Sequence, residues 1–147
     1  MISIKSPITK KELNAYFKFR WRQLRKPLDE PEGSEKDELE SSSHHVMLVN
    51  DDDCVMGVGR IHFVFNKSDK KAQIRYMAID KKIQNRGYGS KILLELEKFA
   101  EDNDVSNIFL HAREEALDFY LKNNYKKIQK SHLLFNEIQH WLMEKKI

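Results

Sequence analysis

A short glycine-containing segment, residues 84–90, constrains the fold of this chain more than any other feature. It follows a strand-like run at 74–80 and precedes a strongly helical run at 92–100. Glycines allow backbone conformations that a Cβ forbids and let a ligand approach closely. The free N–H groups of a first helical turn, aided by the helix dipole, bind anions. We therefore predict a site for a phosphorylated ligand, built from Gln84, Asn85, Arg86, Gly87, Tyr88, Gly89 and Ser90.

The composition is typical of a soluble globular chain with one hydrophobic core. The 147 residues are 40% hydrophobic and 33% charged, which fits a single domain over residues 1–147. The formal net charge of +3 is too diffuse to indicate a nucleic-acid partner. No apolar run approaches the ~20 residues of a membrane span, and the first residues lack the apolar core of a signal peptide. We expect a cytoplasmic protein with no membrane association.

Hydrophobic periodicity predicts three consecutive strands, followed by alternating helices and strands. The three strands cover 46–49, 54–65 and 72–80, with Gly57 and Gly59 marking a bend or bulge in the second. Their short polar connections indicate an antiparallel meander. The other expected elements are a strand at 2–5, helices at 13–24, 88–102 and around 117–121, and strands at 107–112, 125–129 and 140–146.

The segment from Asp29 to Ser43 differs from its surroundings because it is rich in Asp and Glu and contains Pro31 and Gly33. This composition is typical of a loop or a short helix. We interpret it as a solvated, mobile surface segment. The alternative is an acidic rim that attracts a cationic acceptor.

Several classes of phosphate site combine a strand, a glycine turn and a helix. A P-loop needs a Lys followed by Ser or Thr after its last glycine, whereas Ser90 precedes Lys91 here. A dinucleotide fold needs a third glycine at the position of Ile92, and a parallel βαβ unit instead of a meander. A nucleotide-binding protein of another α/β family is therefore a competing but disfavoured hypothesis.

Two segments together resemble one known family. The pattern Gln-x-x-Gly-x-Gly, formed by Gln84, Gly87 and Gly89, resembles motif A of the GCN5-related N-acetyltransferases, the GNAT superfamily. Residues 116–125 are similar to the family's A-x-x-[FL]-Y-x-K-x-G-[FY] segment, with Asn124 in place of the glycine. Asn tolerates the left-handed conformation that this helix end needs. The resemblance implies an α/β (α+β) fold with a central mixed, mostly antiparallel sheet of about seven strands flanked by about four helices.

The resemblance also implies acetyl-CoA as the co-substrate. Its pyrophosphate is expected on the backbone amides of residues 85–90. Its pantetheine arm is expected to pair, like an extra strand, with the backbone of Met77, Ala78 and Ile79, where an N–H could stabilise the developing oxyanion. Arg113 stands where the family often has an asparagine that contacts pantetheine, and we include it among the cofactor-binding residues.

The reaction implied by the resemblance is direct attack of an amine on the thioester in a ternary complex. Tyr120 occupies the family's position for the acid that protonates the leaving thiolate, and a phenol with pKa about 10 is protonated at neutral pH. The incoming alkyl ammonium must lose a proton, and we select His62 as the base. Glu114, His111 and a carboxylate of the acidic segment acting through water are alternatives.

The remaining histidines predict no metal site. His44 and His45 are adjacent and should point to opposite sides of a strand, and His132 and His140 are isolated in the sequence.

Two functions remain after these steps. The first is an acetyl-CoA-dependent N-acetyltransferase that acts on a primary amine of a small molecule or a protein. The alternative is an acyl-CoA-binding regulatory module without turnover, which the presence of Tyr120 disfavours. No motif identifies the acceptor. The superfamily dimerises often, so a homodimer is an open expectation.

Overall fold

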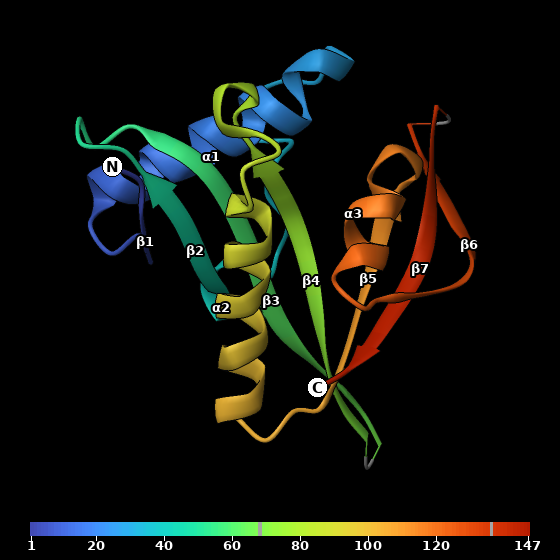
Figure 1. The fold of residues 1–147 in the computed structure, drawn as a ribbon. Coiled ribbons are helices and arrows are strands. Elements are labelled where there is room, and N and C mark those ends of the chain that lie inside the picture. The colour runs from blue at the N-terminus through green and yellow to red at the C-terminus, as the bar shows by residue number, and fades with distance from the viewer. Residues whose placement is uncertain (68, 136) are drawn as a thin grey trace.

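The protein is built around a single seven-stranded sheet (Figure 1). The computed structural model describes residues 1–67, 69–135 and 137–147. The strand order is β1-β2-β3-β4-β5-β7-β6, and within these described residues only β4 and β5 pair in parallel. The predicted mixed, mostly antiparallel sheet and its β2-β3-β4 meander are thus confirmed. The strands are β1 (Ser3–Lys5), β2 (His44–Val49), β3 (Val55–Asn66), β4 (Asp69–Ile79), β5 (Asn107–Arg113), β6 (Lys126–Leu134) and β7 (Ile138–Lys146).

Three α-helices, rather than about four, flank the sheet within the described residues. They are α1 (Lys10–Leu24), α2 (Tyr88–Asp102) and α3 (Leu117–Lys122). Four single-turn 3₁₀ helices accompany them: η1 (Lys26–Leu28), η2 (Glu40–Ser42), η3 (Lys81–Ile83) and η4 (Glu114–Ala116). None of the described helices is long and apolar enough to cross a membrane. Asn124, which follows the C-cap residue of α3, has the left-handed conformation (φ 70°), which confirms the expected substitution for glycine.

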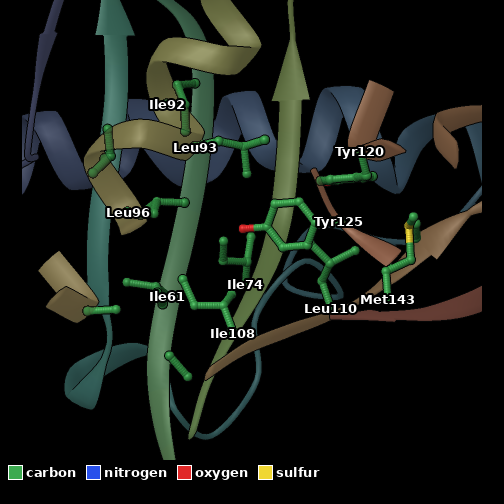
Figure 2. Close-up of a cluster of buried hydrophobic side chains, with 14 of the residues drawn as sticks. Ile61, Ile74, Ile92, Leu93, Leu96, Ile108, Leu110, Tyr120, Tyr125 and Met143 are labelled. Carbon is green, nitrogen blue, oxygen red and sulfur yellow. The ribbon is translucent and has the colours of Figure 1, made fainter. Parts of the chain in front are cut away.

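The two faces of the sheet carry separate hydrophobic clusters. On one face, α2 packs Ile92, Leu93 and Leu96 against the strands, beside Tyr120 of α3 (Figure 2). On the other face, α1 packs Tyr16 and Phe19 against β2 and β3. The adjacent histidines of β2 point to opposite faces as predicted, because His44 stacks on Phe99 of α2 and His45 hydrogen-bonds Tyr16 of α1.

The acidic segment at 29–43 is packed onto the α1 face of the sheet. Two arginines, Arg20 of α1 and Arg60 of β3, are fully buried beneath it. Arg60 Nη1 lies 2.7 Å from Asp37 Oδ1 and 3.0 Å from Glu40 Oε2, and Arg20 Nη1 lies 2.9 Å from the same Glu40 oxygen. The predicted solvation of this segment therefore does not extend to Asp37 and Glu40, because these two carboxylates supply the countercharges for arginines that the sheet buries.

The ion pairs also control the protonation of Asp37. Burial alone would raise the pKa of its carboxyl. Hydrogen bonds from Arg60 and the Leu39 N–H, together with the charges of Arg60 and Arg75, outweigh burial and hold this pKa well below its ordinary value. Asp37 is therefore ionised at neutral pH and serves as an internal countercharge. Because Arg60 and Arg75 already balance its negative charge, it attracts a cationic acceptor only weakly.

We predict that Glu40→Ala lowers the free energy of unfolding by about 3 kcal/mol, because it leaves Arg20 buried without its carboxylate. Chemical denaturation measures this change. Glu38→Ala, at an exposed position of the same segment, is the matched control and should stay within about 0.5 kcal/mol of the parent. Equal stabilities of the two variants would contradict a structural role for the acidic segment.

Candidate active site

The glycine turn has the geometry of an anion site. Gly87 is the N-cap of α2 with φ +85°, and Asn85 also has a positive φ of 62°. No acidic residue lies in the first turn of α2. Among the described residues, none accepts a hydrogen bond from the backbone N–H groups of residues 85–90. These donors are available to a ligand, and the helix dipole adds positive potential there.

Two contacts fix the turn to its surroundings. A Cβ on Gly89 would lie 2.9 Å from the Phe119 ring, so only glycine lets α2 begin this close to α3. The Gln84 side chain donates to the carbonyl oxygen of Ile79 at 3.0 Å, which ties the turn to the end of β4. Arg86 and Lys91 are exposed beside the turn, where their charges can reach an anion.

A β-bulge interrupts β4 immediately before the predicted cofactor-binding residues. Val58 pairs with Ala78 and Arg60 with Arg75, so Tyr76 and Met77 together face the single residue Gly59. Tyr76 has φ 60°, a conformation that a bulky side chain rarely adopts. A Cβ on Gly59 would lie 2.8 Å from Met77 Sδ, so the bulge needs glycine opposite it. The predicted irregularity at Gly59 is confirmed, with the extra residue on β4.

Guanidinium groups surround the ring of Tyr76. The Cζ atoms of Arg20, Arg75 and Arg60 lie 4.1, 4.5 and 4.9 Å from its centroid, and that of Arg25 lies 5.7 Å away. These cation–π contacts hold the strained residue in place. The buried arginines therefore connect the acidic segment to the bulge.

Strands β4 and β5 separate just before the bulge. Their parallel pairing ends at Ile74 and Leu110, although β4 continues to Ile79 and β5 to Arg113 (Figure 1). A cavity of about 440 Å³ lies between them, a volume suited to a small ligand. Three predicted site residues line it: Met77, Arg113 and Tyr120.

A larger cavity of about 540 Å³ lies around the start of β5 and contains none of the predicted site residues. We place the candidate site in the smaller one because the bulge and Tyr120 meet there.

Tyr120 reaches the cavity from α3. Its side chain is 7% exposed, and its hydroxyl makes no hydrogen bond with any described residue. Burial raises the pKa of this phenol above its ordinary value, and the nearby charge of Arg113 offsets only part of the effect. The group is a protonated, uncommitted donor at neutral pH.

His62 is separated from Tyr120 in the structure. It is buried on β3, outside the residues that line the cavity, and its Nδ1 accepts a hydrogen bond from Arg60 Nη2 at 3.1 Å. Burial and the charge of Arg60 lower its pKa. The structure does not bring the two predicted catalytic residues together, and Glu114 is exposed and also outside the lining.

Three histidines from three strands form one wall of the cavity. The rings of His132 and His140 stack with centroids 4.3 Å apart, and His111 lies 5.3 Å from His132. His132 and His140, which are isolated in the sequence, lie beside His111 because antiparallel pairing of β5, β7 and β6 brings distant positions together. Burial lowers the pKa of all three, that of His140 to about 4. The Nδ1 of His111 is buried and has no hydrogen-bond partner among the described residues.

Arg113 lies on the side of the sheet covered by α1. Its Nη2 donates to the carbonyl oxygen of Leu24, the last residue of α1, at 3.1 Å. No group of three or more His, Cys, Asp or Glu in a metal-binding arrangement occurs among the described residues.

Residues 10–125 match the family model described as the acetyltransferase (GNAT) family. That match covers well over half of the chain, and the chain therefore belongs to this family and is an N-acetyltransferase by class. The uncharacterized N-acetyltransferase YjcF of Bacillus subtilis (strain 168) is 31% identical over 115 residues, which are 78% of this chain and 79% of that protein.

Solved structures share the fold at low sequence identity. An aminoglycoside 6'-N-acetyltransferase complexed with coenzyme A has a TM-score of 0.78 and 13% identity, with 99% of this chain and 96% of that chain covered. NAA60 of Arabidopsis thaliana in complex with a bisubstrate analogue has a TM-score of 0.79 and 14% identity, with 100% and 98% covered. These likenesses show the fold and leave the substrates open.

Proposed function

We propose that this protein transfers the acetyl group of acetyl-CoA directly to a primary amine in a ternary complex. One observation carries the proposal. The cavity between the separated strands joins Tyr120 to the part of β4 that has no neighbouring strand on its β5 side. That arrangement provides room for a thioester between a proton donor and open backbone groups. The coenzyme A bound to the structurally similar aminoglycoside enzyme supports the choice of donor.

The donor site is proposed on two stretches of backbone: the free amides of the glycine turn and the end of β4 that has no neighbouring strand on its β5 side. The pyrophosphate is assigned to the free amides of residues 85–90, with Arg86 and Lys91 beside it. The pantetheine arm would extend from there along β4 and pair with the backbone of Met77, Ala78 and Ile79. The bulge turns this backbone, so that an N–H can face the thioester carbonyl and stabilise an oxyanion.

The reaction needs two proton transfers, one from the incoming amine to a base and one from an acid to the leaving sulfur. The amine nitrogen attacks the thioester carbon, the new C–N bond forms, and the C–S bond then breaks to release CoA. Tyr120 is the proposed donor to the leaving sulfur, because its hydroxyl is protonated and has no other partner. We propose His111, rather than His62, as the base for the amine. His111 lines the cavity with an unpartnered Nδ1, whereas the Nδ1 of His62 is occupied by Arg60.

The glycine turn can be tested with two glycines of similar backbone conformation. Gly87 and Gly33 both have positive φ and open space where a Cβ would stand, so alanine at either costs about 1 kcal/mol of stability. We expect Gly87→Ala alone to raise the Kd of CoA, by about tenfold or more, because it reorients the free amides. Calorimetric titration with CoA measures both variants. A similar Kd for the two would contradict the assignment of the pyrophosphate.

The acid can be tested by removing one oxygen. Tyr120→Phe should lower kcat by about 100-fold or more and leave acetyl-CoA affinity unchanged, because the ring still fills its place and only the proton is lost. Tyr125→Phe, which removes a buried hydroxyl outside the cavity lining, is the control. An unchanged kcat would remove the acid role, and no turnover in the parent protein with acetyl-CoA bound would favour a regulatory module.

The base determines how activity depends on pH. The pKa of His111 is lowered by burial first and then by His132 and Arg75, so it lies below the ordinary 6.5. A base works in its neutral form, and we therefore expect kcat to fall only as pH drops through a value below 6.5. His111→Gln should abolish this acid limb, whereas His62→Gln should keep it. The reverse result would return the role of base to His62.

A further inference from the structure

The cavity is strongly cationic on the side that faces α1. Arg25, Arg75 and Arg113 line it together with the three histidines. No aspartate or glutamate is among the described residues of that lining. A ligand that enters from this side therefore meets positive charge that the lining itself does not balance.

Other buried arginines of the protein are given carboxylate partners. Arg60 and Arg20 are fully buried and pair with Asp37 and Glu40. Arg75 also reaches Asp37, at 2.9 Å. The acidic segment thus supplies carboxylates to Arg20, Arg60 and Arg75. Among the described residues, it forms no ion pair with Arg25 or Arg113.

Arg25 and Arg113 have only neutral partners among the described residues. Arg25 donates from Nε to the carbonyl of Ser34 and from Nη1 to that of Leu24, and Arg113 donates from Nη2 to the same Leu24 oxygen. Each Leu24 contact is 3.1 Å, so the two donating nitrogens are at most twice that distance apart. Nη2 of Arg25 and both Nε and Nη1 of Arg113 donate to no described residue.

The electrostatics agree with this geometry. Burial lowers the pKa of Arg25, and the charges of Arg113, Arg75 and Arg20 lower it further. Burial likewise lowers the pKa of Arg113, and the charge of Glu115, which makes no ion pair with it within 4 Å, offsets only part of the effect. Capping the carbonyl end of α1 accounts for one donor from each side chain, since a helix C-terminus attracts cations. A single shared carbonyl does not balance the guanidinium charges of the buried Arg25 and the half-buried Arg113.

The phosphates of a CoA donor are assigned elsewhere. The glycine turn opens α2, which covers the opposite face of the sheet from α1 (Figure 1). The free arginine donors are held at the end of α1 by Leu24. These donors therefore lie on the α1 side of the cavity, away from the glycine turn, where an acceptor amine could enter.

We propose that the acceptor is a small amine that carries an anionic group, a carboxylate or a phosphate, and that Arg25 and Arg113 bind this group. The amine then extends toward Tyr120 and the thioester at the other end of the same cavity. Guanidinium forks match both anions in geometry. This substrate class rests on the proposed acetyl transfer, and it replaces the cationic acceptor that the acidic segment had suggested.

Paired probes that differ only in the anion test the proposal. O-phosphoethanolamine is compared with ethanolamine and β-alanine with propylamine, with spermidine as a cationic reference. Each is titrated calorimetrically into protein saturated with CoA, and kcat/KM for acetylation is measured with acetyl-CoA. We expect the anionic member of at least one pair to bind about tenfold or more tightly than its partner. The phosphate and carboxylate pairs separate the two anions.

Variants attribute the preference to the two arginines. Arg113→Gln and Arg25→Gln should abolish it, Arg113→Lys should retain part of it, and Arg22→Gln, exposed on α1, should leave it intact. Thermal unfolding checks that each variant is folded, and the unchanged CoA affinity shows that the donor site is intact.

Equal or absent affinity for both members of every pair would overturn the proposal, as would tighter binding of spermidine. So would a preference that survives in both glutamine variants, or a loss of CoA affinity in Arg113→Gln, which would place the arginine in the donor site. Failure of the proposed function looks different: CoA itself would not bind, or no acetyl group would be transferred.

Discussion

The rest of the site depends on the cation–π contacts between four arginines and the ring of Tyr76. Its residue has a backbone conformation that is strained for a bulky side chain, and four guanidinium groups hold its ring within 6 Å. Two of these arginines, Arg20 and Arg60, are fully buried and pair with the carboxylates of Asp37 and Glu40. The acidic segment therefore stabilises the bulge, the bulge lies where β4 leaves β5, and the cavity opens where those strands separate.

The architecture divides the proposed reaction between two faces of one sheet. The glycine turn and α2 provide amides for the donor on one side, and the end of α1 provides free guanidinium donors on the other. Tyr120 and the histidine wall line the cavity between β4 and β5, which the end of α1 also lines through Leu24. The histidines are neutral at physiological pH because burial lowers their pKa values, which suits them to accept a proton.

Local signals predicted most of the fold, and contacts between distant segments account for what was missed. The glycine turn, the meander and the α2 helix follow from spacing and turn chemistry over short windows, and the predicted bounds of α2, 88–102, agree with the structure. The role of residues 29–43 depends on Arg20 and Arg60, which no local pattern identifies as buried. The histidine wall likewise depends on the register of β5, β7 and β6. Alternation along β5 places His111 and Arg113 on one face, but only the pairing adds His140.

The protein is proposed to transfer an acetyl group from acetyl-CoA to an amine in the cavity between β4 and β5. Release of the CoA thiol, measured together with mass spectrometry of the amine over a panel of primary amines, tests this transfer most directly. We expect thiol release that requires an amine and matches N-acetylated product in amount. Tight binding of acetyl-CoA with no amine-dependent thiol release across the panel would contradict it.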